Sequence, residues 1–382
     1  MTRVIVPTEL ADVETRVAAT PRTVKRMARA GLDVHVQSGA GAASGIEDDE
    51  FTEAGAAVVD DRGELFGGAE IVLSVREPGP ETIERIPAGA VLISVLNPLI
   101  EHGLVNELAS REISSFSLDL MPRITRAQSM DVLSAMSTLS GYQSVLLAAM
   151  TLPGIMPYLT TAAGTLHPAK VLVLGAGVAG LQAIATARRL GALVWGYDIR
   201  PVVKEQVESL GAEFLDVMDT SDDAEDAGGY AREQSEDQAE QQQQAMISHL
   251  AKMDAVITTA LIPGRPAPVL LTADMVAAMR PGSVIVDLAA ERGGNCELTR
   301  PGENFTSDSG VSILGPLDLP CTVPAHASLM YANNVANFLL HVCHDGRIDL
   351  ESDDEVVVGT LVTHGGHVVH ERVREVLGST ES

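Results

Sequence analysis

The chain has 382 residues, of which 46% are hydrophobic, and its 52 Asp and Glu against 26 Lys and Arg give a formal net charge of −26. This length and hydrophobic content suit two domains with cores of their own and exclude a largely disordered chain. The strong negative charge argues against nucleic acids and anionic lipid surfaces as general partners, because both would be repelled.

The basic residues are of an unusual kind, since only four of them are lysines and the other 22 are arginines. Abundant carboxylates with almost no lysine suit a very salty cytoplasm, where salt screens the repulsion between like charges. We therefore expect a halophilic protein, and an ordinary acidic protein is the other interpretation. The four lysines are Lys25, Lys170, Lys204 and Lys252.

Three cysteines, Cys296, Cys321 and Cys343, are widely spaced and form no CxxC pair. They indicate neither a disulfide framework nor a zinc site and fit a reducing cytoplasm. The chain begins with a strand-like stretch at residues 3–6 in place of a basic segment followed by an apolar core, so no signal peptide is indicated. We expect a cytoplasmic protein.

The first 120 residues alternate between short apolar stretches and helix-like stretches. This alternation predicts a parallel sheet covered by helices. The predicted strands cover residues 34–36, 56–59, 70–75 and 90–96, and the predicted helices cover residues 21–30 and 99–110.

Residues 132–166 carry no charged side chain. Their length alone would permit a membrane-spanning helix. However, serines and a glutamine interrupt the first half, and Pro153 and Pro157 break the second half. We expect a buried helix between two domains, followed by an irregular segment.

A second alternating block begins at Lys170. The two blocks together predict an α/β chain with two doubly wound, Rossmann-like lobes and a cleft between them. We expect residues 1–132 and 321–382 in the first lobe and residues 133–320 in the second. In the second block we predict strands at 171–174, 193–197, 255–260, 283–289 and 311–314 and helices at 178–190, 204–210 and 272–279, and after it a helix at 325–343 and a final strand at 355–362.

Residues 219–244 differ in composition, because they are rich in Asp, Glu, Gln and Ala. A segment this long without periodic pattern is usually either functional or disordered. It is therefore either a solvated acidic excursion or a flexible lid, and its composition alone does not choose between them.

The hexapeptide at residues 175–180 reads Gly-Ala-Gly-Val-Ala-Gly, a GxGxxG pattern. It follows a predicted strand and opens a predicted helix, which is the context that a dinucleotide-binding loop requires. Gly175 would permit the tight turn, Gly177 would let the backbone approach the pyrophosphate, and Gly180 would let the helix pack on the sheet. The sequence therefore predicts a dinucleotide site in the second lobe.

Asp198 ends the next predicted strand, 18 residues after Gly180. A carboxylate at that place accepts hydrogen bonds from the adenosine ribose and repels a 2′-phosphate, which favours NAD(H) over NADP(H). Arg200 complicates this interpretation, because a nearby arginine can accommodate that phosphate.

Several common catalytic arrangements are missing from the sequence, among them HExxH and GxSxG motifs. His364, His367 and His370 recur at three-residue intervals, but Gly365 and Gly366 between them indicate a hairpin turn, and we expect no metal. Hydride transfer between two nicotinamides needs no protein acid or base, so this absence is compatible with redox chemistry.

Over nearly its full length the chain resembles the NAD(H)-binding component of proton-translocating nicotinamide nucleotide transhydrogenase, a relative of alanine dehydrogenase. The motifs that carry the resemblance lie at residues 123–131 (RITRAQSMD), 175–180 with Gly191 and Ala192, 204–211 (KEQVESLG), 258–268 (TTALIPGRPAP) and 286–296 (VDLAAERGGNC).

The resemblance implies roles for individual residues. Gln128 would hold the nicotinamide ribose and bridge toward the second nucleotide, Arg123 would hold the carboxamide, and Asp131 and Ser134 would complete the pocket. Residues 228–230, Gly-Gly-Tyr, would form the tip of a loop that closes over the nucleotide, so Tyr230 joins the candidates. From the residues alone, Arg123 and Arg126 could equally be surface cations and Asp131 a helix cap.

The expected site therefore has two sets of residues. The predicted catalytic residues are Arg123, Gln128, Asp131, Ser134 and Tyr230, and the predicted cofactor-binding residues are Gly175, Ala176, Gly177, Val178, Ala179, Gly180, Asp198, Ile199, Arg200, Ala260, Leu261 and Glu291.

Alanine dehydrogenase is the alternative within the same resemblance. That family uses a lysine and a histidine, whose matching positions here are Arg76 and Asn97, and Glu291 stands where that family has an aspartate. Asn cannot act as an acid or base, and Arg does not readily release its proton, so amino-acid oxidation is disfavoured. A non-catalytic NAD sensor is a third possibility, and the retained nicotinamide-end motif argues against it.

The resemblance also implies partners. NADP(H) would be held by another polypeptide, and the membrane-spanning helices that translocate protons would lie on separate subunits. The chain would be a homodimer on the cytoplasmic face of the membrane, held there by protein contacts.

Overall fold

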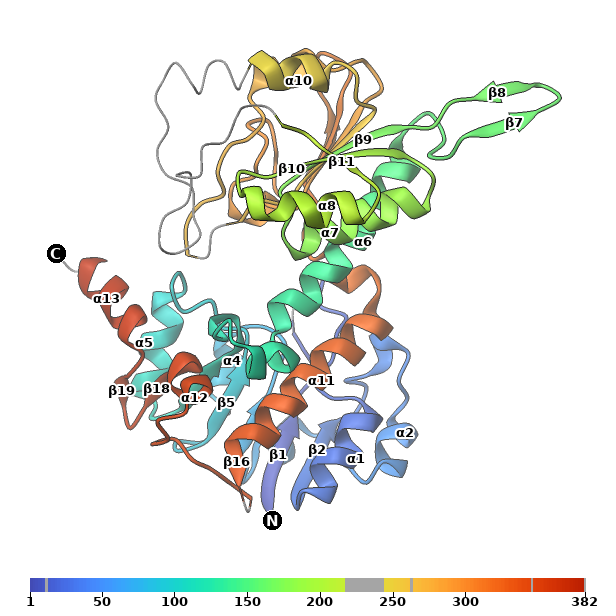
Figure 1. Cartoon of the computed structure of the whole chain (residues 1–382). Helices are drawn as coiled ribbons and strands as arrows, with labels where there is room; N and C mark the ends of the chain where they lie inside the picture. Colours follow the sequence, from blue (N-terminus) through green and yellow to red (C-terminus); the bar gives the residue numbers. More distant parts are fainter. Residues whose placement is uncertain (11–12, 217–243, 262–263, 345, 381–382) are drawn as a thin grey trace. The chain divides into compact units, whose positions relative to one another are not determined.

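The computed structural model describes residues 1–10, 13–216, 244–261, 264–344 and 346–380 (Figure 1). The chain divides into two compact units, of which unit 1 comprises Met1–Met136 with Pro320–Ser382 and unit 2 comprises Ser137–Leu319. The first boundary thus falls inside helix α6 (Val132–Thr151), a few residues beyond the predicted boundary at 132. The predicted α/β class with two Rossmann-like lobes is confirmed, because each unit is built on a largely parallel sheet with helices.

Unit 1 contains an eight-stranded sheet whose order is β19-β18-β6-β5-β4-β1-β2-β3. Strands β1 to β6 are parallel, and β18 and β19 are antiparallel additions at one edge. The order reverses at β1, which has β2 on one side and β4 on the other. The strands are β1 (Thr2–Val6), β2 (Leu32–Gln37), β3 (Ala57–Val59), β4 (Ile71–Leu73), β5 (Val91–Ser94), β6 (Ser114–Ser117), β18 (Leu361–His364) and β19 (His367–Val368).

Helices cover both faces of this sheet because its strands are apolar on both sides. Val4 and Val6 join one core cluster with residues of α1 and α11, whereas Ile5 between them joins another with residues of α3, α4 and α5. Phe338 of α11 packs edge-on against Phe116 of β6, with ring centroids 5.2 Å apart. The helices are α1 (Pro21–Arg29), α2 (Asp48–Glu53), α3 (Arg62–Phe66), α4 (Pro80–Ile83), α5 (His102–Ser110), α11 (Pro324–Val342), α12 (Glu355–Thr360) and α13 (Glu371–Thr380).

Short elements complete unit 1. Gly365 and Gly366 form the turn between β18 and β19, so the predicted hairpin at the C-terminal histidines is present. The 3-10 helices are η1 (Ala42–Ser44), η2 (Leu118–Leu120), η3 (Thr125–Met130) and η6 (Leu319–Thr322), and a two-stranded ribbon joins β16 (Cys343–His344) to β17 (Arg347–Ile348).

Unit 2 contains a seven-stranded sheet whose order is β11-β10-β9-β12-β13-β15-β14. All of its strand pairs are parallel except β14 with β15. The order reverses at β9, so the loop after β9 stands at the switch point where doubly wound folds bind ligands. The strands are β9 (Lys170–Leu174), β10 (Leu193–Tyr197), β11 (Glu213–Phe214), β12 (Ala255–Thr258), β13 (Val284–Asp287), β14 (Asn304–Thr306) and β15 (Ser312–Leu314).

The helices of unit 2 again pack on both faces of the sheet. Val171 and Val173 contact one cluster with residues of α6, α7 and α8, and Leu172 and Leu174 contact another with residues of α10 and of a helix at 244–250. The remaining helices are α7 (Val178–Arg189), α8 (Lys204–Ser209), α10 (Ala273–Ala277), η4 (Pro201–Val203) and η5 (Ala290–Arg292).

Helix α6 is, among the residues that the structure describes, the one helix long and apolar enough to cross a membrane by length and composition, with a mean hydropathy of 1.2. It contributes Val132 to the core of unit 1 and Val145 and Ala148 to the core of unit 2. A Cβ at Gly141 would lie 2.1 Å from the carbonyl oxygen of Ala179, so only glycine allows α6 to approach the start of α7 this closely. Helix α6 therefore packs against both cores, while 28% of its apolar window is buried.

Two predicted segments differ from the structure. Residues 355–362 are not a strand throughout, because the Asp354 carboxylate caps helix α12 by accepting from the Val356 N–H at 2.7 Å, and β18 begins only at Leu361. The segment after α6 is irregular only at residues 152–158. It contains an antiparallel hairpin of β7 (Leu159–Thr161) and β8 (Gly164–Leu166), which extends from the rest of unit 2 in Figure 1.

The predicted lid at 219–244 lies outside the described residues, except for Gln244, which lies in the helical stretch described at residues 244–250.

Candidate dinucleotide site

Two positions in the loop after β9 must be glycine, because nearby atoms of the chain leave no room for a side chain there. Gly175 has φ of +97°, and a Cβ there would lie 2.6 Å from the Thr259 hydroxyl oxygen. A Cβ at Gly180 would lie 1.8 Å from the carbonyl oxygen of Gly175. Both positions therefore require glycine so that the turn, helix α7 and the segment after β12 can pack together.

Gly177 is different, because nothing in the chain itself requires glycine there. It is the N-cap residue of α7 with φ of −77°, and a Cβ would meet no atom within 4 Å. The open space therefore lies at the N-terminus of a 12-residue helix, where backbone N–H groups and the helix dipole favour an anion. This is the space that a dinucleotide pyrophosphate needs, so the residues present fit that group.

Asp198 connects the end of β10 to this loop. It is buried, and its carboxylate accepts from the Ala176 N–H at 2.7 Å and from the Arg200 N–H at 2.9 Å. The Arg200 guanidinium also forms a two-bond contact with it, through Nε and Nη2, each at 3.0 Å. Burial alone would raise the pKa of Asp198, but the hydrogen bonds from Arg200 and Ala176 outweigh it and lower that pKa.

Three apolar side chains of the predicted set are exposed around this loop. Val178, Ile199 and Leu261 are 46%, 38% and 52% exposed, which is unusual for large aliphatic residues. They follow β9, β10 and β12, which are neighbours in the parallel sheet, so they share its carboxyl edge. Such side chains offer apolar walls to a bound ring system.

Two buried residues that the sequence reasoning missed hold the neighbouring loops. The Asn295 side chain accepts from the Ala260 N–H at 2.9 Å and donates to the carbonyl oxygens of Ala260 at 2.9 Å and Pro268 at 2.8 Å. It thereby fixes Ala260, which follows β12 at the carboxyl edge of the sheet. Asn295 lies in the motif at 286–296. The sequence signal for it was an asparagine directly after Gly293-Gly294.

Asp287 is the second missed residue. Its fully buried carboxylate accepts from the hydroxyls of Thr258 at 2.9 Å and Thr299 at 2.6 Å, and from the N–H groups of Ala289 and Cys296, each at 3.0 Å. These four bonds join the end of β12 to the segment after β13. Glu291, by contrast, is exposed, and it accepts from the Asp318 N–H at 3.2 Å.

The predicted nicotinamide-end residues lie in and next to η3 of unit 1. Arg123 and Gln128 are exposed, whereas the η3 backbone is anchored to α11 because Asn334 and Asn337 each donate to the Ser129 carbonyl oxygen at 2.8 Å. Arg126 is an exposed cation that pairs with Asp354 at 3.0 Å and Glu355 at 2.9 Å.

Asp131 acts as the cap of α6. Its carboxylate accepts from the Ser134 N–H at 2.9 Å and from the Ser134 hydroxyl at 2.5 Å. The helix-cap interpretation of Asp131 is therefore confirmed, and the nicotinamide roles of these residues stay predictions. Tyr230 lies outside the described residues.

Comparison with known proteins assigns the family. The family described as "Alanine dehydrogenase/PNT" matches with its N-terminal domain at residues 5–140 and with its C-terminal domain at residues 144–371. The chain belongs to the alanine dehydrogenase/PNT family.

Within this family the chain is similar to transhydrogenases and, more distantly, to alanine dehydrogenases. An NAD(P) transhydrogenase alpha-subunit chain of Rhodospirillum rubrum is 46% identical over 376 residues, which cover 96% of this chain and 98% of that one. A solved transhydrogenase from Sinorhizobium meliloti is 43% identical with a TM-score of 0.84, covering 97% of this chain and 99% of that one. A solved L-alanine dehydrogenase is 27% identical with a TM-score of 0.82, covering 99% of each chain.

Arg76 and Asn97 are the two positions at which the sequence differs from the lysine and histidine of alanine dehydrogenases. The Arg76 Nε lies 2.6 Å from the fully buried carboxylate of Glu14, and the Asn97 amide donates to Glu77 at 3.0 Å. Burial would raise the pKa of Glu14, but its bonds with Arg16 and Arg76 lower it to about 2. Arg76 is thus held as the cation of an ion pair, which is no arrangement for proton transfer at neutral pH.

Proposed function

We propose that this chain is the NAD(H)-binding subunit of a proton-translocating NAD(P) transhydrogenase. The observation that carries the proposal is the β9–α7 loop, with open space at Gly177 and a buried ionised carboxylate at Asp198. The near full-length similarity to a transhydrogenase alpha subunit adds the reaction class. In this reaction NADH and NADP⁺ give NAD⁺ and NADPH, and NADP(H) is held by a partner subunit.

The chain's own residues would bind and orient the nucleotide. The first turn of α7 would hold the pyrophosphate, and Asp198 would accept hydrogen bonds from the adenosine ribose. Because the pKa of Asp198 is low, its carboxylate is charged at neutral pH and repels a 2′-phosphate. The Arg200 guanidinium forms an ion pair with the same carboxylate, so the positive charge of Arg200 faces Asp198. Both features support NAD(H) over NADP(H).

The bound NADH supplies the hydride itself, so no side chain has to donate or remove a proton. The contribution of the chain is proximity and orientation of the two nicotinamides. We propose that Gln128 orients the nicotinamide ribose and Arg123 the carboxamide, with Asp131 and Ser134 beside them. The exposure of Arg123 and Gln128 on an anchored η3 supports these roles.

The proposed assembly is a homodimer that docks on membrane-spanning and NADP(H)-binding subunits at the cytoplasmic face of the membrane. Proton translocation would belong to those subunits. The β7–β8 hairpin supports self-association, because every residue of both strands is exposed, with Leu159 and Leu166 at 45% and 48%. Exposed apolar residues on a projecting hairpin are typical of an interface. We also propose that the chain is adapted to high salt, because it has many carboxylates and only four lysines.

An alanine dehydrogenase activity is the competing function within the family. The ion-paired Arg76 and the amide of Asn97 disfavour it, because neither can act as the acid or base of that reaction. A sensor that binds NAD without reaction is the other alternative.

The experiment that separates these functions uses the purified chain in high salt with NADH. With its NADP(H)-binding partner and an NADP⁺ analogue that absorbs at a distinct wavelength, we expect reduction of the analogue. With pyruvate and ammonia we expect no oxidation of NADH. NADH oxidation in the second mixture only would contradict the proposal, and NADH binding with no turnover in either would favour the sensor.

A further inference from the structure

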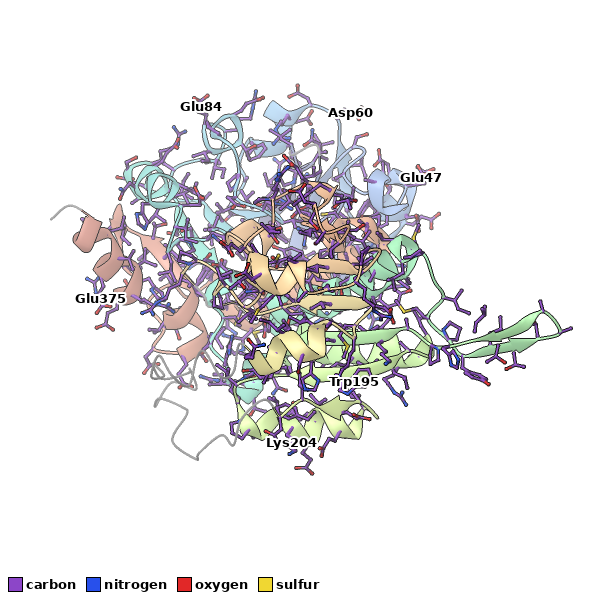
Figure 2. All side chains as sticks on the ribbon, turned by 90° about the horizontal axis from the view of Figure 1, so that it is seen from above. Glu47, Asp60, Glu84, Trp195, Lys204 and Glu375 are labelled. Carbon is purple, nitrogen blue, oxygen red and sulfur yellow. The ribbon has the colours of Figure 1, made fainter. Side chains whose placement is uncertain are left out.

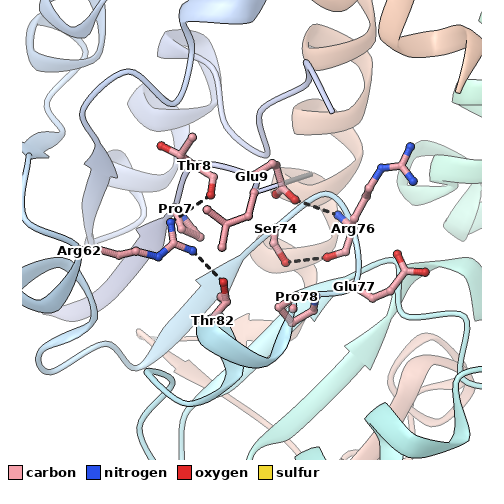
Figure 3. A pocket seen from close by; sticks show the side chains of 11 residues that line it. Pro7, Thr8, Glu9, Arg62, Ser74, Arg76, Glu77, Pro78 and Thr82 are labelled. Atoms are coloured by element: carbon pink, nitrogen blue, oxygen red, sulfur yellow. Dashed lines mark hydrogen bonds between the residues drawn. The ribbon is translucent and has the colours of Figure 1, made fainter. Parts of the chain in front are cut away.

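A cavity of about 280 Å³ lies in unit 1, at the carboxyl edge of its sheet (Figure 3). Its walls come from residues 7–10, which follow β1, and residues 74–79, which follow β4. The strand order reverses between these two neighbouring strands, and ligands of doubly wound folds bind in the crevice at such a reversal. The cavity shares no residue with the set of predicted dinucleotide-binding residues.

Arg62 supplies a cation to this cavity. Its guanidinium donates to the Thr8 carbonyl oxygen at 3.2 Å, to Gln37 Oε1 at 3.0 Å and to the Thr82 hydroxyl oxygen at 2.8 Å, all of which are uncharged acceptors. Across the residues that the structure describes it forms no ion pair, and its Nε is buried without a hydrogen-bond partner. Glu81 and Glu9 attract the guanidinium only from beyond ion-pair distance, so when Glu9 is protonated the Arg62 charge has no close counter-ion.

Glu9 lines the same cavity and is held in place by backbone contacts. Its Oε1 accepts from the Val75 N–H at 2.6 Å, and its Oε2 lies 3.4 Å from the backbone nitrogen of Arg76. Burial raises the pKa of Glu9 to about 7, so the group is protonated in mildly acidic solution. In that form it can donate a hydrogen bond to an oxygen in the cavity, whereas its carboxylate form would repel an anion.

The remaining walls limit the size and kind of occupant. Ser74 and Thr82 contribute hydroxyl groups, and Pro7 and Pro78 contribute apolar surface. In Figure 3, Arg62 stands on one side of this space and Arg76 on the other, with Thr82 and Pro78 between them. Arg76 is paired with Glu14, so Arg62 is the cation that calls for a counter-charge. One charge, several hydroxyls and a small volume suit a compact monoanion with a short carbon chain.

We propose that this cavity binds a small hydroxylated monocarboxylate, with its carboxylate on Arg62 and with Glu9 and Thr82 within reach of its polar atoms. The site is distinct from the dinucleotide loop and uses neither Arg76 nor Asn97 for recognition. The bound acid is an effector or a stored ligand and undergoes no reaction there.

The test measures binding of 3-hydroxybutyrate to the purified full chain by titration calorimetry, with butyrate and inorganic phosphate as comparison probes. We expect saturable 3-hydroxybutyrate binding with a Kd of about 1 mM and a loss of at least about tenfold in Arg62→Gln. Arg22→Gln, which changes an exposed arginine of α1, should bind as the wild type does. NADH binding, measured beside it, should be the same in all three proteins, and a thermal unfolding transition like that of the wild type shows that unit 1 of each is folded.

The pH dependence provides a readout that a structural role of Glu9 would not give. The charged and titratable groups around it are Glu14, Arg16, Arg62, Arg76, Glu77 and Tyr331. With the pKa of Glu9 at about 7, 3-hydroxybutyrate affinity should fall about tenfold from pH 6 to pH 8. Glu9→Gln should remove this dependence, and Glu77→Gln should keep it.

Three results would overturn the proposal. The first is no saturation by 3-hydroxybutyrate at about 10 mM while NADH binds normally. The second is binding that survives Arg62→Gln. The third is phosphate binding as tight as that of the monocarboxylate, which would make the cavity a general anion site.

Discussion

The Asp198 carboxylate holds the glycine-rich loop and Arg200, and we propose that it also binds the adenosine ribose. One oxygen accepts from the Ala176 N–H in the glycine-rich loop, and both oxygens contact Arg200. The loop shape, the position of Arg200 and the negative charge that disfavours a 2′-phosphate thus depend on the same residue. Under the proposed function, this is how a chain with a nearby arginine would favour NAD(H).

Asp198→Asn should therefore weaken NADH binding by about tenfold to a hundredfold, because a charge-assisted hydrogen bond to ribose is worth about 1.5–3 kcal/mol. The preference for NADH over NADPH should shrink at the same time. Fluorescence titration with both nucleotides measures this. Asp216→Asn, an exposed carboxylate paired with Lys204, is the control and should change neither value. Unchanged NADH affinity in Asp198→Asn would refute the ribose contact.

Glu14 is the residue through which unit 1 should respond to acid. Its buried carboxylate joins Arg16 and Arg76, and these partners lower its pKa to about 2 from an ordinary value of 4.5. Because the folded-state pKa lies below the unfolded one, its stabilisation is present above pH 4.5 and is lost as pH falls toward 2.

Glu14→Gln should lower the free energy of unfolding at pH 7 by about 3 kcal/mol, because it leaves two cations without their buried partner. The difference from the wild type should narrow as the pH falls below 4.5. Urea unfolding at several pH values measures it. Glu81→Gln, which breaks only an exposed pair with Arg85, should change the stability by less than about 1 kcal/mol. A difference that is constant with pH would contradict the ion-pair account.

At the scale of elements, the β9–α7 turn separates two glycines that the fold requires from a third, beside which we propose that the nucleotide binds. Gly175 and Gly180 face neighbouring backbone and side chains, whereas Gly177 faces open space. A substitution series can therefore distinguish packing from nucleotide binding within a single turn.

Gly177→Ala should lower the free energy of unfolding by about 1 kcal/mol or less and still weaken NADH binding by about tenfold or more, because its methyl group occupies the pyrophosphate space. Gly180→Ala should destabilise unit 2 by about 3 kcal/mol or more, because its Cβ would overlap the Gly175 carbonyl oxygen. Thermal unfolding and NADH titration of both variants measure this. Normal NADH affinity in a folded Gly177→Ala would show that the open space does not belong to the site.

The accuracy of the sequence prediction followed the kind of signal in each element. Strands such as 193–197 were predicted with their observed bounds, since apolar runs between glycine-marked helix ends are unambiguous. The prediction of a strand at 355–362 was wrong. Three consecutive valines suggested a strand, but residues 355–360 form a helix that the Asp354 side chain caps. The β7–β8 hairpin was missed because its residues are exposed and lack alternation.

The candidate site shows the same division. The GxGxxG loop and Asp198 were predictable because their order along a βαβ unit fixes their place in space. Asn295 and Asp287 were missed because their roles depend on hydrogen bonds to Ala260, Pro268, Thr258 and Thr299, which are distant along the chain. Local patterns do not report such contacts.

At the scale of the whole molecule, the net charge of −26 is the dominant feature. Exposed carboxylates such as Glu47, Asp60, Glu84 and Glu375 project from unit 1 (Figure 2). Their mutual repulsion opposes the compact state and weakens as the Debye length falls from about 10 Å in 0.1 M salt to about 3 Å in 1 M salt.

The thermal midpoint should therefore rise by roughly 5 °C or more between about 0.1 M and about 1 M KCl. Calorimetry at fixed pH measures this, and an equal rise in NaCl would assign it to screening in place of a specific cation site. A midpoint that does not move over this range would contradict adaptation to high salt.

The central claim is direct hydride transfer from a nucleotide on this chain to one on a partner. The most direct measurement uses NADH deuterated at the transferred position, the NADP(H)-binding partner and an NADP⁺ analogue, with wild type, Gln128→Asn and the exposed control Gln206→Asn. We predict deuterium in the reduced analogue without exchange with water, and in Gln128→Asn a transfer slowed at least about tenfold with NADH affinity within about twofold of the wild type. Loss of the label to water, absence of transfer with NADH bound, or equal losses of rate and affinity in Gln128→Asn would contradict the account.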